Sequence, residues 1–235
     1  MEAFLAQVLA DLAQSAAPER AVQEKAYLKS QLEFLGVGIP RIRAAAMAAL
    51  KNLEIQQKIQ PQQLRSLTLA AYATRSHDAR AVALAVLEKR AKQLTVADLP
   101  WLEDVLRRSF SWAYVDQIAV HAVGQIVRRE PDAAKAVLAK WATDDDFWLR
   151  RTALLALLGE MRAGGTFDRD HFEAWATPMF REKEFFIRKA IGWVLRDVAG
   201  KDPDWVRGFL ERHATQMSPL SVREARRGVE RAVAN

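Results

Sequence analysis

Apolar residues recur along this chain at intervals of three and four, which is the spacing of one face of an α-helix. The alternation of β-branched and polar residues that is typical of strands is almost absent. Prolines stand at or near the start of the apolar segments, where a helix tolerates them because its first N–H needs no intrahelical partner. These are Pro18, Pro40, Pro61, Pro100, Pro131, Pro203 and Pro219. The pattern predicts an all-α protein.

Segments between these prolines predict about a dozen helices joined by short connections. They cover residues 2–14, 18–34, 40–53, 61–74, 77–93, 95–108, 111–129, 131–142, 146–161, 168–180, 183–199, 203–213 and 218–233.

The expected helices form pairs, and the pairs repeat. FWLRRTALLALL begins at Phe147, and the similar FFIRKAIGWVL begins at Phe185. Related segments begin at Ser76, Ser111 and Ser218. Helix pairs that recur at roughly 35–40 residues are typical of HEAT-like solenoids, which curve around a concave face. We therefore expect a superhelical solenoid that forms a single HEAT-like repeat domain over residues 1–235. The alternative is a helical bundle without true repeats.

Charge and composition narrow the chemistry. Lys and Arg number 35 and Asp and Glu 29, so the 235-residue chain carries a formal charge of +6, which suits an anionic partner and nucleic acid first. Cysteine is absent, which excludes disulfides, thiolate catalysis, zinc fingers and iron–sulfur clusters. The four histidines are far apart, and no GxGxxG, P-loop or GxSxG motif occurs. We expect neither a metal nor a cofactor.

We also expect neither a signal peptide nor a membrane-spanning segment. The first residues, MEAFLAQVLADLAQ, lack the basic start and the long apolar run of a signal peptide. No stretch approaches the ~20 apolar residues of a membrane span. We expect a cytoplasmic protein that does not enter a membrane.

One carboxylate stands out on the segment Ser111–Glu130. Trp112 and Asp116 are four residues apart, so they lie one above the other on the shoulder of the apolar stripe. A carboxylate beside apolar groups is costly unless something satisfies it, and Asp116 lies beyond the first turn, where the helix dipole helps little. Asp116 is either a functional group or the partner of an arginine in the next repeat.

Trp193 and several cations are the other candidates. Trp193 lies away from the core stripe of its helix, on a side shared with Phe186, Lys189 and Arg196, and could stack on a base, a sugar or a guanidinium. The alternative is that it packs on the next repeat. Arg150 and Arg151 open an apolar helix against its dipole, which suits phosphate binding or pairing with nearby aspartates.

Several segments of the chain are similar to those of a known protein family. Five segments of the chain are SWAYVDQI, FWLRRTALL, KEFFIRKAIGWVLRDVAGKDPDWV, MSPLSVREA and KAYLKSQLEFLGVGIPRIR. Together they resemble the AlkD-type DNA glycosylases of the DNA alkylation repair family. The resemblance spans nearly the whole chain. It implies HEAT-like repeats that cradle double-stranded DNA in a basic concave groove. It also implies excision of alkylated purines, 3-methyladenine and 7-methylguanine above all, by a monofunctional enzyme.

The resemblance also implies roles for individual residues. The catalytic aspartate corresponds to Asp116, and the two sugar-facing tryptophans correspond to Trp112 and Trp193. Arg151 and Arg196 correspond to phosphate-contacting arginines, and Tyr27 to a tyrosine of the groove. With these we group Arg150, Lys189 and Arg43 as expected DNA contacts. A monomer bound to the bacterial nucleoid is the expected state.

Two departures from the family pattern concern the grip on DNA. Many relatives carry a Trp–Trp pair where this chain has Ser111 and Trp112, and some carry a lysine where this chain has Gly159. Two other functions stay open at this stage. The chain could be a repeat protein that binds DNA without catalysis, or a protein–protein scaffold, which is the usual role of HEAT arrays.

Overall fold

The computed structural model describes residues 1–56 and 59–234, and in this part the chain is helical without a strand. The predicted all-α class is confirmed. Contacts divide the chain into two compact units, Met1–Ile118 (unit 1) and Ala119–Asn235 (unit 2). A repeat array also divides in this way, because each repeat contacts only its neighbours. The single repeat domain over residues 1–235 therefore stays a prediction.

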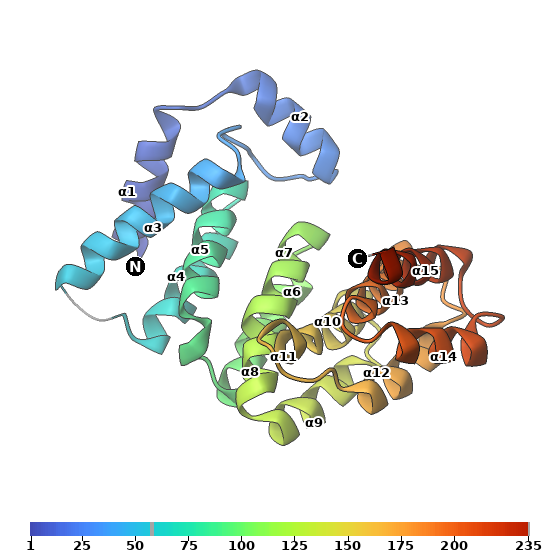
Figure 1. The fold of residues 1–235 in the computed structure, drawn as a ribbon. Coiled ribbons are helices and arrows are strands. Elements are labelled where there is room, and N and C mark those ends of the chain that lie inside the picture. The colour runs from blue at the N-terminus through green and yellow to red at the C-terminus, as the bar shows by residue number, and fades with distance from the viewer. Residues whose placement is uncertain (57–58, 235) are drawn as a thin grey trace. The chain divides into compact units, whose positions relative to one another are not determined.

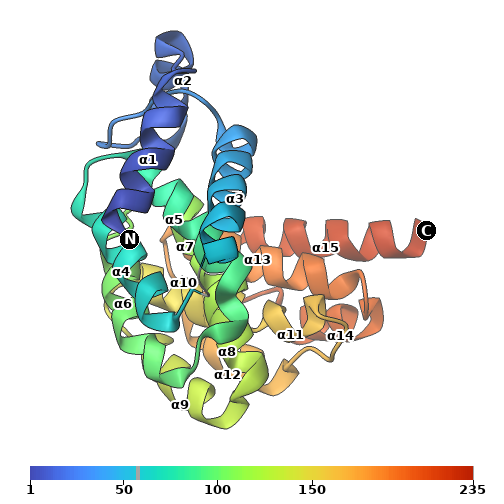
Figure 2. The ribbon, with the colours of Figure 1, turned by 90° about the vertical axis from the view of Figure 1, so that its left-hand side faces the viewer.

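Unit 1 is built from helix pairs that stack in chain order. Its helices are α1 (Glu2–Ala13), α2 (Pro18–Leu28), α3 (Ile39–Gln56), α4 (Pro61–Ala73), α5 (His77–Arg90), α6 (Leu99–Arg107) and α7 (Trp112–Gln117). Helix α3 packs on α1 and α5, α4 packs on α5 and α6, and α7 packs on α5. Figures 1 and 2 both show α3 beside α5. Contact between each helix and the one two places further on is the packing of a helical solenoid.

Unit 2 repeats this arrangement. Its helices are α8 (Gly124–Arg129), α9 (Pro131–Trp141), α10 (Phe147–Ala156), α11 (Leu158–Arg162), α12 (Arg169–Ala176), α13 (Phe185–Ala199), α14 (Pro203–His213) and α15 (Pro219–Ala234). Helices α10, α13 and α15 pack in that order, and α13 and α15 lie side by side in Figure 1. The segments that begin at Phe147 and Phe185 thus start neighbouring helices, as the repeat predicted.

Glycine sets how closely α13 and α15 approach each other. A Cβ on Gly228 of α15 would lie 2.7 Å from the Cα of Arg196 on α13, which is too close for any other residue without movement of the backbone. The two helices therefore cross nearly backbone to backbone at this point.

The helix starts agree with the expectation from the prolines. Helices α2, α4, α9, α14 and α15 each begin at a proline. Other starts are capped by a side-chain oxygen that accepts a backbone N–H, as Ser76 does for α5 and Asp146 does for α10. These local signals explain why most predicted boundaries lie within a few residues of the structure.

The predicted helix over residues 18–34 is wrong beyond Leu28. Helix α2 ends at Leu28, and Lys29 takes the left-handed conformation with φ = 48°. Further on, the backbone of Glu33 is bound on both sides, because its N–H donates to Arg75 and its carbonyl accepts from His77. These partners lie more than 40 residues away, and no local pattern reveals them.

The predicted helix over residues 111–129 is continuous but not uniform. Its middle, Ile118–Val123, is π-helical and separates α7 from α8. Its predicted stripe of Val115, Ala119, Ala122 and Ile126 is buried. The boundary between the two units falls inside this segment. π-Helical turns are rare and frequently lie at functional sites, and this one begins two residues after Asp116.

None of the helices that the structure describes is long and apolar enough to cross a bilayer.

Candidate functional site

Trp112 and Tyr27 form an aromatic pair in unit 1. Trp112 is the first residue of α7, and the side chain of Ser111 caps this helix by accepting the N–H of Ala113 at 3.4 Å. The ring of Tyr27, on α2, meets the Trp112 ring edge-on, with centroids 6.1 Å apart. Tyr27 is 74% exposed, and α2 buries no residue. The structure thus brings two predicted site residues together and leaves one of them open to solvent.

Asp116 lies one turn after Trp112 on the same helix and is half-buried. Between them, Tyr114 and Val115 face the core, so the carboxylate and the indole share the other side of a short helix. Asp116 takes part in an interaction with another group. The predicted spacing of indole and carboxylate on one helix is present.

A buried aromatic network beneath α7 fixes this helix, and the guanidinium of Arg80 lies over the rings of Tyr72 and Tyr114, 4.4 and 5.6 Å from their centres. The Nδ1 of His77 and the hydroxyl of Tyr114 share a hydrogen bond of 2.6 Å, and Phe34 stacks on the imidazole at 4.2 Å between centroids. Burial lowers the pKa of His77 to about 4, so the imidazole is uncharged at neutral pH. Burial also raises the pKa of Tyr72, which shares a hydrogen bond of 3.0 Å with Ser109, to about 12. Sequence reasoning missed this network because its members come from helices and loops that are far apart in the sequence.

Arg43 is held by an ion pair within unit 1. Its guanidinium makes two parallel hydrogen bonds to Glu88, at 2.7 and 2.8 Å, and the amide of Gln117 donates to the same carboxylate at 3.1 Å. The hydrogen bond to Glu88 raises the pKa of Arg43, although burial opposes it. The geometry gives Arg43 a part in joining α3 to α5, and its role as a DNA contact stays a prediction.

In unit 2, two guanidinium groups lie over the ring of Trp193. Those of Arg151 and Arg162 lie 5.8 and 5.5 Å from its ring centre. Arg151 is only 2% exposed and donates to the carbonyl of Phe186 at 2.5 Å, whereas Arg162 pairs with Asp197 at 2.5 Å. Arg151 is therefore placed to orient Trp193, and a direct phosphate contact would require its guanidinium to become accessible.

Glu224 forms ion pairs with the other two predicted cations of unit 2. It accepts from Lys189 at 3.1 Å and from Arg196, and it is buried. Burial alone would raise the pKa of this carboxyl, but the hydrogen bond from Lys189 and the charges of Lys189, Arg196 and Arg227 outweigh it and lower the pKa. The carboxylate is thus ionised and fixes two cations on α13. The sequence did not single out Glu224, because its partners lie about 30 residues earlier.

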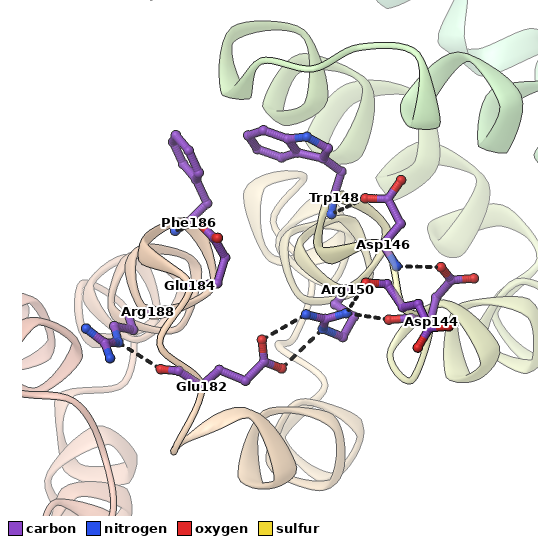
Figure 3. Close-up of polar contacts among 9 residues, drawn as sticks. Asp144, Asp146, Trp148, Arg150, Glu182, Glu184, Phe186 and Arg188 are labelled. Carbon is purple, nitrogen blue, oxygen red and sulfur yellow. Dashed lines mark hydrogen bonds and ion pairs between the residues drawn. The ribbon is translucent and has the colours of Figure 1, made fainter.

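Arg150 has a structural role that Figure 3 shows. Its guanidinium donates to both carboxylate oxygens of Glu182, at 3.1 and 2.9 Å, and to the carbonyls of Asp144 and Asp145. Asp146 caps α10 by accepting the N–H of Trp148 at 2.9 Å. The expected pairing with nearby aspartates is made through their backbone carbonyls, whereas the carboxylate that Arg150 binds is that of Glu182. Its contact with DNA stays a prediction.

Gly159, where some relatives carry a lysine, has a steric reason to be glycine in this chain. A Cβ at Gly159 would lie 2.6 Å from the carbonyl oxygen of Gly124, on the neighbouring α8. Helices α8 and α11 therefore meet backbone to backbone, and a lysine cannot be accommodated in this packing.

Unit 2 also contains a basic pocket of about 540 Å³ near the end of α13. Four cations line it, namely Arg162, Arg196, Lys201 and Arg231, together with the single acid Asp197. This lining suits an anion. Among the described residues, no group of three His, Asp or Glu side chains is placed to hold a metal ion.

Comparisons with known proteins agree with this fold. Residues 8–229 match the family model of the DNA alkylation repair enzymes. The structure is similar to that of a predicted DNA alkylation repair enzyme from Enterococcus faecalis, with a TM-score of 0.76 and 24% identity. That match covers 89% of this chain and 94% of the other. Comparison with curated protein sequences gave no match.

The chain therefore belongs to the DNA alkylation repair enzyme family, because the family model covers nearly all of it. The predicted family resemblance is confirmed at this level.

Proposed function

We propose that this protein is a monofunctional DNA glycosylase that hydrolyses the N-glycosidic bond of cationic alkylpurines in duplex DNA. Its substrates would be lesions such as 3-methyladenine and 7-methylguanine, and its product an abasic site. Membership of the DNA alkylation repair family supports an enzyme that acts on damaged DNA.

The chemistry fits a site with one principal carboxylate. Alkylation at N3 or N7 leaves the purine cationic, so the base can depart without being protonated and no general acid is needed. Positive charge then develops on the deoxyribose, as in other glycoside hydrolyses. A carboxylate near the sugar stabilises this charge electrostatically and can orient the attacking water.

The observation that carries the proposal is the placement of Trp112 and Asp116 in unit 1. They lie one turn apart on α7, with the indole half-buried and paired with the exposed ring of Tyr27. We assign Asp116 to stabilisation of the sugar cation. The face of Trp112 would add a cation–π contribution to the same charge.

Trp193 is assigned the second sugar-facing role on evidence from unit 2 alone. The guanidinium groups of Arg151 and Arg162 lie over its ring and help to hold the indole on α13. Lys189 and Arg196 are the best-supported phosphate contacts, because Glu224 orients both and the basic pocket includes Arg196. Arg43, Arg150, Arg151 and Tyr27 complete the proposed DNA-binding set.

Base release from methylated duplex DNA tests the proposal. Free bases are measured by mass spectrometry under single-turnover conditions for the wild-type protein and for Asp116→Asn. We expect a loss of more than about tenfold in the Asn variant, because an interaction made in the transition state is removed. Asp132→Asn, which alters an exposed aspartate in the first turn of α9, is the matched control and should release bases normally.

Other outcomes would favour the alternative functions. Salt-sensitive DNA binding without base release by the wild-type protein would indicate a non-catalytic DNA-binding repeat protein. No affinity for duplex DNA at physiological salt, with Arg151→Ala silent in the binding assay, would indicate a protein–protein scaffold. An Asp116→Asn variant as fast as wild type would remove Asp116 from the mechanism.

The same proposal includes a HEAT-like concave groove as the DNA-binding surface. It also includes action as a monomer in the cytoplasm, on the nucleoid.

A further inference from the structure

Phe110 is the most solvent-exposed of the large apolar side chains, at 78%. It lies in the loop between α6 and α7, directly before the cap of the helix that carries Trp112 and Asp116. Its backbone is left-handed, with φ = 50°. For a bulky residue this conformation is an outlier, because its Cβ crowds the neighbouring backbone.

The loop around Phe110 is anchored on both sides. Ser109 is buried, donates to the carbonyl of Val105 at 2.9 Å and bonds the hydroxyl of Tyr72 at 3.0 Å. Ser111 is also buried, and it caps α7. Both residues that flank Phe110 are therefore fixed, while Phe110 itself is left-handed and its side chain is exposed.

Stability does not explain a phenylalanine at this position. A left-handed backbone favours glycine or asparagine, and an exposed ring buries little apolar surface. Strained residues that persist in a well-anchored loop cluster at functional sites, which makes such an outlier a reason to look for a ligand.

The surroundings of Phe110 indicate which ligand. Trp112 follows two residues later and contacts the exposed Tyr27, so three aromatic residues gather around the start of α7. Two residues of extended chain span at most about 7 Å, which is about twice the ~3.4 Å spacing of successive nucleotides along one DNA strand. Phe110 therefore lies within reach of the nucleotides next to the one that Trp112 contacts.

We infer that Phe110 is a DNA-contacting residue that stacks on an unstacked base or a deoxyribose beside the damaged nucleotide. This rests on the proposed function, since it takes Trp112 as a sugar contact. Aromatic side chains bind nucleic acid in this way without reading sequence, because every base presents a π-face. The anchored, left-handed loop holds the ring in place before DNA arrives, so little ordering is needed on binding.

The substitution Phe110→Gly tests the inference, because it should weaken DNA binding without lowering the stability of the protein. Phe110→Gly relieves the left-handed strain, so its Tm should equal or exceed that of the wild-type protein. Its affinity for a duplex that contains a tetrahydrofuran abasic analogue should fall about tenfold, the effect typical of losing one stacked base. Phe110→Tyr keeps a ring and should restore binding. Ile55→Ala removes another exposed apolar side chain of unit 1, on α3, and should leave affinity unchanged.

The fluorescence of a base analogue gives a second measurement, which responds to stacking by the ring of Phe110. With 2-aminopurine placed beside the abasic analogue, the wild-type protein and Phe110→Tyr should change its fluorescence, and Phe110→Gly should not.

Several results would overturn the inference. These are wild-type affinity in Phe110→Gly, loss of affinity in Phe110→Tyr equal to that of the glycine variant, or a Phe110→Gly variant with a Tm several degrees below wild type. Affinity that depends on Phe110 without any base release by the wild-type protein would remove the proposed function but support this contact. A wild-type protein that binds no duplex would overturn both.

Discussion

The two units position their candidate residues by different means. In unit 1, α7 is supported mainly by buried aromatic groups, since the neutral imidazole of His77 bonds the hydroxyl of Tyr114 and the guanidinium of Arg80 lies 5.6 Å from the Tyr114 ring centre. In unit 2, α13 is positioned by charge, since Glu224 holds Lys189 and Arg196, while Arg151 and Arg162 lie over the ring of Trp193.

The difference corresponds to the proposed tasks of the two regions. A carboxylate stabilises a sugar cation electrostatically only if it is held close to the sugar, and the network under α7 fixes the helix that carries Asp116. Phosphate contacts need cations that are already oriented, and an ionised carboxylate beneath Lys189 and Arg196 provides that orientation.

The largest expected effect concerns the close packing of unit 2. Gly159→Leu would place a side chain against the backbone of Gly124, where even a Cβ lies 2.6 Å from the carbonyl oxygen. We expect a loss of about 3 kcal/mol in the free energy of unfolding, measured by urea denaturation. Gly208→Ala on α14 is the matched control, because the nearest atom to its Cβ is a side-chain atom at 3.6 Å, and it should be neutral or stabilising. A Gly159→Leu protein as stable as wild type would show that α8 and α11 can separate at no cost.

The next effect concerns the buried, neutral imidazole of His77 in unit 1. The pKa of His77 is lowered to about 4, from about 6.5 in the unfolded chain, so the unfolded state binds the proton more readily. The stability that depends on neutral His77 is complete above pH 6.5 and is lost as the pH falls toward 4. Between pH 7.5 and pH 5 this contributes a loss of about 2 kcal/mol.

Urea denaturation at the two pH values measures this loss, and His77→Gln should remove it from the difference. The lowered pKa of Glu224 acts at lower pH, because its stabilisation is lost only as the pH falls through a value below the ordinary glutamate range. If His77→Gln kept the full loss between pH 7.5 and pH 5, the buried imidazole would not be the acid-sensitive group of unit 1.

The smallest effect concerns the cations of unit 2. If Lys189 and Arg196 contact phosphates, Lys189→Ala and Arg196→Ala should each lower the slope of log K against log salt concentration by about one. Fluorescence anisotropy with a labelled duplex at several salt concentrations gives this slope. Arg207→Ala on α14 removes a cation that pairs with Asp204 and should not change it. Equal slopes for all of these proteins would place Lys189 and Arg196 outside the DNA contact.

Much of the fold follows from local sequence signals. Prolines and capping side chains mark helix starts, and similar segments at Phe147 and Phe185 correctly predict two neighbouring helices. The failures have distant causes. Helix α2 ends early where Lys29 turns left-handed, and the loop after it is bound by the start of α5. The π-helical turn after α7 also lacks a recognisable local signal.

The candidate site was predictable in part. The spacing of Trp112 and Asp116 on one helix could be predicted from helical periodicity, and both residues lie on α7. The ion pairs of Arg43 with Glu88 and of Arg196 with Glu224 could not, because their partners lie 45 and 28 residues away. The left-handed conformation of Phe110 could not be predicted from the sequence either, since nothing in its residue type favours it.

The glycine contacts of unit 2 restrict which mutations the gene can accept. Any substitution at Gly228 adds at least a Cβ, which would meet the backbone of Arg196 at 2.7 Å. Every single-nucleotide change in a glycine codon that alters the residue yields a larger side chain or a stop, so no neighbouring codon is conservative. A library of random variants selected for folding should retain Gly228 and Gly159 for lack of space. Gly164 should be conserved less strictly and for another reason, since a Cβ there meets no atom within 4 Å but the φ of +94° favours glycine.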